Sequence, residues 1–173
     1  MAQAGTMPVL ATPSDAISAL ERDLPKALRN RSLEEAGWRR PDGMTLVVPL
    51  QGRQANGTVD EYLLKLGFAY YPEWPPSALF VNPQTLNYDS DKDKCWLPLI
   101  DGCPEIAVHA KYQTIGQLIC CSLTLEFYAI KHDVKPEHVW IAQKHNFSAT
   151  INQIDWVLKS PFYKGRQNAL PSR

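Results

Sequence analysis

The chain has 173 residues, which is long enough for one domain with a substantial core and too short for two ordinary domains. Its 18 basic residues balance its 18 acidic residues, so it lacks the net positive charge that attracts nucleic acids and anionic membrane surfaces. No apolar run approaches the roughly 20 residues of a membrane-spanning helix, and residues 1–15 lack the pattern of a secretory signal. We therefore expect a soluble, cytoplasmic protein that binds neither nucleic acid nor membrane.

The first expected element is a helix over residues 13–31. Thr12 offers a capping hydroxyl, Pro13 suits the first helical position, and Asp15 lies near the positive end of the helix dipole. Pro25 is the weak point, because an interior proline removes a backbone hydrogen bond and kinks or shortens a helix. Apolar residues recur at near-helical spacing along this stretch, namely Ile17, Leu20, Leu24 and Leu28.

Three strands are expected next. They are MTLVVPL (residues 44–50), EYLLKLGF (residues 61–68) and SALFV (residues 77–81). A polar loop with Asn56 and Gly57 makes the first two an antiparallel pair. The stretch YYPEWPP precedes the third strand, and its prolines cannot donate hydrogen bonds to a sheet. We therefore place a corner there, between two strands.

The second half of the chain is harder to interpret. Residues 82–104 form an irregular loop, long enough to suggest a function, and residues 105–112 suit a strand. LICCSLTLEFYAIKH fits a buried strand and also a helix, and we interpret it as a strand followed by a loop. A helix capped by Ser148 and stopped by Pro161 should follow. Its apolar face would carry Ile151, Ile154 and Leu158.

The cysteines predict free thiols. They are Cys95, Cys103, Cys120 and Cys121. Two of them are adjacent, which suits neither a disulfide framework nor a paired-cysteine zinc site. The spacing of His132, His138 and His145 likewise matches no ordinary zinc pattern. We expect no metal site.

In this order the elements resemble the ubiquitin-conjugating (E2) family, and in particular its bacterial relatives. FAYYPEWPPSALF matches the family's aromatic-proline corner and following strand, and His109 precedes the stretch from Gly116 to Cys120 as a histidine precedes the family's cysteine. Trp140 and FSATINQIDWVLKSPFY match a tryptophan and a closing helix that ends in Leu-x-x-Pro. The resemblance implies an α+β, UBC-like fold over residues 13–163, with an N-terminal helix, an antiparallel β-meander and a C-terminal crossover helix. Residues 1–12 and 164–173 would be tails.

The resemblance also implies an enzyme that works without a metal or an organic cofactor. Cys120 would accept a ubiquitin-like protein from an E1-like activating enzyme as a thioester and pass it to an amine or other nucleophile of a protein target. Cys121 is the rival, and in a strand the two side chains would face opposite sides. His109 would support the thiol loop. A basic stripe on the first helix would help to dock the E1-like enzyme, and it consists of Arg22, Lys26 and Arg29.

Two other functions stay open. His109-Ala110-Lys111 stands where the family has His-Pro-Asn, which leaves the oxyanion donor to Asn146 or a backbone N–H and favours a catalytically inactive binding module. A cysteine hydrolase built from Cys121, a histidine and Asp133 is the other alternative.

Overall fold

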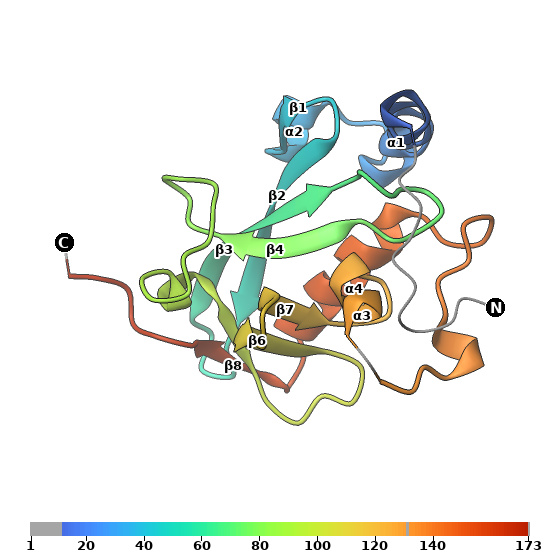
Figure 1. The fold of residues 1–173 in the computed structure, drawn as a ribbon. Coiled ribbons are helices and arrows are strands. Elements are labelled where there is room, and N and C mark those ends of the chain that lie inside the picture. Colours follow the sequence, from blue (N-terminus) through green and yellow to red (C-terminus); the bar gives the residue numbers. More distant parts are fainter. Residues whose placement is uncertain (1–11, 131, 173) are drawn as a thin grey trace.

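The computed structural model describes residues 12–130 and 132–172, which form an α+β fold with an antiparallel sheet (Figure 1). The helices are α1 (Pro13–Ala27), α2 (Leu33–Ala36), α3 (Leu125–Ala129) and α4 (Phe147–Leu158), with 3-10 turns η1 (Lys94–Trp96) and η2 (Pro136–His138). The strands are β1 (Arg39–Asp42), β2 (Thr45–Arg53), β3 (Val59–Gly67), β4 (Ser77–Val81), β5 (Pro98–Ile100), β6 (Ala107–Tyr112), β7 (Gly116–Cys120) and β8 (Tyr163–Arg166). No described helix has both the length and the apolar character needed to cross a membrane.

Helix α1 begins where the sequence predicts, and ends earlier. The Thr12 hydroxyl accepts a hydrogen bond from the Asp15 N–H at 3.3 Å. The predicted end at Arg31 is wrong, because the helix stops at Ala27 and both Arg29 and Asn30 adopt left-handed backbone angles. Pro25 is accommodated in the last turn of the helix.

The central sheet has the order β1-β2-β3-β4, and all its neighbours are antiparallel. The three strands predicted after the first helix are therefore confirmed as β2, β3 and β4, although β2 and β3 shift by one to three residues at their ends. Alternate residues of β3 are buried, and so are those of β2, where Val47 is buried in addition. Helix α4 packs on this side, against β2 (Figure 1).

The proline corner between β3 and β4 joins three elements. Its Tyr71-Pro72 peptide bond is cis, and the Tyr71 side chain is fully buried. The Tyr71 hydroxyl donates a hydrogen bond to Asp23 of α1 and accepts one from the Phe147 N–H of α4 at 3.3 Å. Trp140 donates its indole N–H to the Pro72 carbonyl at 2.9 Å. The corner is thus the place where both long helices are fixed to the sheet.

Residues beyond 163 take part in the fold. Tyr163–Arg166 form β8, which pairs with β5 inside the stretch 82–104 that the sequence assigns to an irregular loop. The guanidinium of Arg166 lies 4.8 Å from the ring centre of Tyr62 and 5.5 Å from that of Trp96. It also forms an ion pair with Asp60 at 3.3 Å. Residues 164–166 are therefore joined to the domain rather than trailing from it.

Helix α4 has a different first residue from the one expected. Asn146, not Ser148, is its N-cap, because the Asn146 backbone is extended and its side-chain oxygen accepts the Ser148 N–H at 3.0 Å. Ser148 lies in the first turn instead. The expected apolar face is confirmed, since Ile151, Ile154 and Leu158 are buried.

Candidate thiol site

The hairpin of β6 and β7 presents the two adjacent cysteines in different ways. In its register Ala107 lies opposite Cys120 and Val108 lies opposite Ile119. Ile119 and Cys121 belong to the hydrophobic core, so the side chain of Cys120, which lies between them in the chain, points to the other face of the hairpin. Strand β7 ends at Cys120, so the prediction that the two cysteines face opposite sides of one strand stays a prediction.

Exposure and protonation separate the two thiols further. Cys121 is only 3% exposed, and burial raises its pKa to about 11, although the Leu123 N–H opposes part of this rise. Cys120 is half-buried, and burial raises its pKa as well. Cys120 is therefore the more accessible thiol of the pair, but both sulfurs are protonated at neutral pH.

His109 shares a face of the hairpin with Cys120. It lies opposite Leu118, two residues before Cys120 on the same strand, so its side chain is the diagonal neighbour of the thiol. Diagonal neighbours in an antiparallel pair are about 7–8 Å apart at the backbone, which is still within reach of aromatic side chains. The imidazole packs against Tyr112, with ring centres 5.2 Å apart. The structure brings His109 to the thiol face without joining it to the sulfur.

The turn after Cys120 is fixed by side-chain hydroxyl groups. Thr124 is fully buried, and its hydroxyl lies 2.8 Å from the Ile119 carbonyl and 2.9 Å from the Cys121 carbonyl. The Tyr128 hydroxyl donates to the Ser122 carbonyl at 2.8 Å. The Thr150 hydroxyl of α4 donates to the Leu123 carbonyl at 2.7 Å. Three side chains thus hold four carbonyls next to the thiol, and we name this set the hydroxyl cradle: Thr124, Tyr128 and Thr150.

Sequence reasoning missed the hydroxyl cradle. It interpreted the stretch after Cys120 as a loop, whereas α3 begins at Leu125 and Thr124 is its N-cap residue. The available signal was the polar hydroxyl of Thr124 between two leucines, because a buried hydroxyl needs a hydrogen-bond partner.

The remaining candidate residues lie apart from this site. Asn146 uses its side-chain oxygen to cap α4, and Asp133 is exposed. His145 accepts the Ile141 N–H at 3.0 Å, and burial followed by the charge of Lys144 lowers its pKa. Across the described residues, no three His, Cys, Asp or Glu side chains gather in a way that suits a metal ion.

The basic stripe on α1 is shorter than expected. Arg22 forms two hydrogen bonds with Asp23, at 2.9 and 2.8 Å. Lys26 lies one turn further along the helix. Arg29 lies beyond the helix end with a φ of 52°, so the helical spacing that groups it with the other two does not extend to it.

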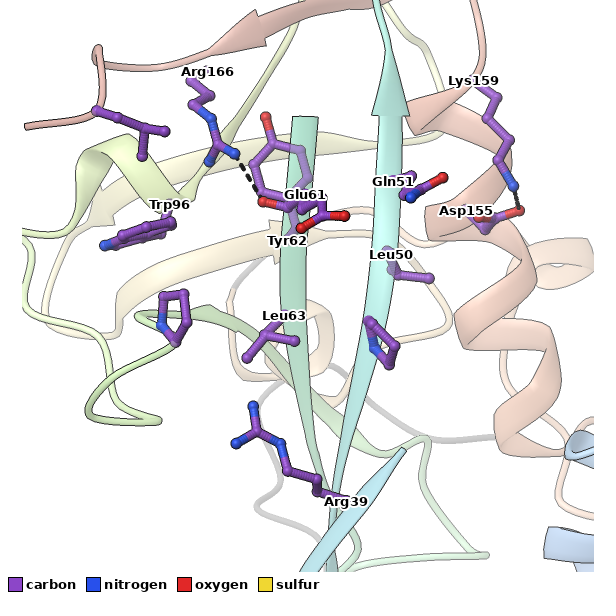
Figure 2. A pocket seen from close by; sticks show the side chains of 13 residues that line it. Arg39, Leu50, Gln51, Glu61, Tyr62, Leu63, Trp96, Asp155, Lys159 and Arg166 are labelled. Carbon is purple, nitrogen blue, oxygen red and sulfur yellow. Dashed lines mark hydrogen bonds and ion pairs between the residues drawn. The ribbon is translucent and has the colours of Figure 1, made fainter. Parts of the chain in front are cut away.

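A hollow of the described surface lies elsewhere, across β2 and β3 (Figure 2). It has a volume of about 720 Å³. Figure 2 shows Arg166 and Trp96 at one end and Arg39 at the other, with Leu63 between them. Neither cysteine of the thiol site lines this hollow.

In comparisons with known proteins, no family model, no curated protein and no solved structure matches this chain.

Proposed function

We propose that this protein is an E2-like carrier with a UBC-like fold, in which Cys120 accepts a ubiquitin-like modifier from an E1-like activating enzyme. The observation that supports this proposal best is the contrast between the two adjacent thiols. Cys121 is buried in the core, whereas Cys120 lies half-exposed on the opposite face of the hairpin, with His109 on the neighbouring strand.

The first step is an exchange of thioesters. The Cys120 sulfur attacks the carbonyl carbon of the modifier's thioester, a new C–S bond forms, and the C–S bond to the E1-like enzyme breaks. The leaving thiolate takes up the proton that Cys120 loses, so the exchange needs no net base. A thiol whose pKa is raised by burial can therefore take part once the partner enzyme is bound.

The second step is transfer to a protein target. A lysine amine of the target attacks the Cys120 thioester, a C–N bond forms, and Cys120 leaves as the thiolate and recovers a proton that the amine loses. In the proposal, Arg22 and Lys26 of α1, together with Arg29 just beyond the helix end, contact the E1-like enzyme, and His109 shapes the thiol face. A reducing, cytoplasmic environment would keep Cys120 free for each cycle.

A second candidate function is a binding module of the same fold that never forms a thioester. The observation that favours it is the pKa of Cys120, which burial raises. The replacement of His-Pro-Asn by His109-Ala110-Lys111 points the same way.

A charging assay separates the two functions. The protein is mixed with an E1-like enzyme, a ubiquitin-like modifier and ATP, and the products are separated on a non-reducing gel. A carrier gives an adduct that a reductant removes, that Cys120→Ala abolishes, and that Cys103→Ala, a matched change at another half-buried cysteine, retains. An adduct lost in Cys121→Ala but kept in Cys120→Ala would move the site to Cys121. Absence of any adduct with a panel of E1-like enzymes favours the binding module.

A further inference from the structure

A second hollow of the described surface lies at one end of the central sheet, between two loops. One wall is the end of β2 and the turn that leads to β3, and the other is the connection from α4 to β8 with the first residues of β8. The volume of this hollow is about 510 Å³. Pockets of about 300–1,000 Å³ suit small molecules. No residue of the thiol site lines it, so its role is separate from acyl transfer.

The charged residues that line this second hollow are all cations. They are Arg53 of β2, Lys159 at the C-cap of α4, and Lys164 of β8. The whole chain has as many acidic as basic residues, so a lining with three cations and no carboxylate is a local feature. The hollow across β2 and β3 differs, because Glu61 and Asp155 line it beside its cations. The second hollow therefore favours an anionic ligand.

The three cations differ in how far they are already paired. Arg53 is exposed and forms no ion pair within residues 12–130 and 132–172. Lys164 donates to the Pro161 carbonyl at 2.8 Å, which leaves its charge without a counter-ion in the same part of the chain. Lys159 lies 2.7 Å from Asp155, one turn earlier in α4. An exposed pair of this kind is weak, so Lys159 can exchange it for a ligand.

We propose that the second hollow binds the phosphate group of a small phosphate monoester. A phosphate dianion has three terminal oxygens and two charges, so it can contact cations from three elements at once, whereas a carboxylate has a single charge in a single plane. The planar guanidinium of Arg53 can donate two parallel hydrogen bonds to two of the phosphate oxygens. Lys159 and Lys164 supply point charges from the opposite wall.

The remaining lining suits the organic part of such an ester. Ala55, Pro161 and Tyr163 line the same hollow, and their side chains are apolar or aromatic. Asp60 accepts a hydrogen bond from the Tyr163 hydroxyl, but this carboxylate is already paired with Arg166 at 3.3 Å. Asp60 therefore adds no free negative charge that would repel a phosphate.

The test compares two anions that share a ring. Phenyl phosphate is a dianion at about pH 8, because its second pKa is near 6, and benzenesulfonate is a monoanion. Each is titrated into the full chain at one ionic strength, and amide NMR signals report the affinity and the place of binding. We expect phenyl phosphate to shift the signals of residues 53–56 and 159–164 and to bind about tenfold more tightly or better, since one further charge-assisted hydrogen bond accounts for that difference. Equal affinities, or shifts confined to other residues, overturn the inference.

Variants separate a ligand site from a set of charges that only stabilise the end of α4. Arg53→Gln lies outside any helix, and we expect it to weaken phenyl phosphate binding about tenfold, as should Lys164→Gln. Arg39→Gln is the matched control, because Arg39 is an exposed arginine of the other hollow, and its affinity should equal that of the wild type. An unchanged affinity in folded Arg53→Gln overturns the inference.

A phosphoserine peptide is the last probe, because a phosphorylated side chain presents the same group. Phenyl phosphate that binds as tightly as the peptide supports a small ester as the ligand. A peptide that binds at least about tenfold more tightly would require contacts outside the second hollow, and it would replace the small ester by a phosphorylated protein. None of these outcomes depends on the charging assay, which reads the thiol site.

Discussion

The ring of Tyr163 in β8 lies directly on Gly52 in β2, with no room for a side chain between them. A Cβ atom at Gly52 would come within 2.7 Å of the Tyr163 hydroxyl oxygen and of a ring carbon. The φ angle of Gly52 is not in the left-handed region, so the glycine is needed for space and not for backbone freedom.

Gly52→Ala should therefore destabilise the protein by about 1–3 kcal/mol, the usual cost of overpacking a core. Denaturant unfolding measures this change. Gly67→Ala in β3 is the control, because a Cβ atom there meets Ser77 at an ordinary 3.6 Å. Equal losses in the two variants would show that Tyr163 does not lie against Gly52 in solution.

The carboxylate of Asp60 makes the stability of the folded state depend on pH. Burial raises its pKa, but hydrogen bonds from Tyr163 at 2.5 Å and Gln54 at 2.8 Å, together with Arg166, outweigh burial and leave the pKa below its ordinary value. A lowered pKa in the folded state contributes stability above the unfolded pKa of about 3.9, and this stability is lost as the pH falls through the folded pKa.

Asp60→Asn should accordingly lower the free energy of unfolding at pH 7 by about 1–3 kcal/mol, because an amide N–H would face the Arg166 cation. The deficit should shrink when unfolding is measured at decreasing pH below about 4. The exposed Asp133→Asn should show no such change. A deficit that stays constant from neutral pH to strong acid would contradict the lowered pKa.

The pKa of Glu126 in α3 is shifted in the opposite direction. Its carboxylate accepts the Ala78 N–H at 3.2 Å, and burial raises its pKa. A raised carboxyl pKa favours the folded state most below the unfolded pKa of about 4.3, and this contribution is lost as the pH rises through the folded pKa. Glu126→Gln keeps the acceptor and removes a half-buried charge, so its melting temperature should exceed that of the wild type at pH 7. The gain should vanish near pH 4. A Glu126→Gln variant less stable than the wild type at pH 7 would refute this account. Glu137→Gln is the control, because Glu137 is exposed.

Gln117 in β7 closes the free edge of β4. Its side-chain oxygen accepts the Phe80 N–H at 2.7 Å, and its side-chain N–H donates to the Phe80 carbonyl at 2.8 Å. Gln117→Leu would leave two buried backbone groups unpaired, at about 1–3 kcal/mol each. We expect a large loss of stability and faster hydrogen exchange of the Phe80 amide. Exchange that stays as slow as in the wild type would show that another partner replaces Gln117.

Labelling with iodoacetamide should separate the adjacent thiols. Cys120 should react and Cys121 should stay unlabelled in the folded protein, because Cys121 is buried and its pKa is about 11. Since burial raises the pKa of Cys120 too, its labelling rate should rise about tenfold per unit between about pH 6 and 8. Mass spectrometry of the peptide identifies the labelled sulfur. A rate that levels off near neutral pH would mean that the pKa of Cys120 is lowered, and this would contradict the effect of burial.

The elements that the sequence predicted are those with a local signal. Thr12 marks the start of α1 by its hydroxyl, and the alternating apolar residues of β3 place one face in the hydrophobic core. The N-cap of α4 was harder to predict, because the side chains of Asn146 and Ser148 both suit that role. Which of them caps the helix depends on the backbone that precedes it, and the structure has Asn146 there.

The elements that it missed depend on distant partners. YKGR has no strand pattern, and β8 forms only because β5 supplies hydrogen bonds and Gly52 leaves room for Tyr163. The hydroxyl cradle is equally non-local, since Thr150 reaches the thiol turn from α4. The unequal burial of Cys120 and Cys121 agrees with the expectation that at most one of the two adjacent thiols is exposed.

The place of β8 also limits how this protein is made. Tyr163 and Arg166 complete the packing around Tyr62, and Tyr62 lies in β3, a strand of the central sheet. A growing chain cannot finish its core until residue 166 has left the ribosome exit tunnel, so Cys120 emerges and is open to electrophiles and oxidants before the domain that buries Cys121 is closed.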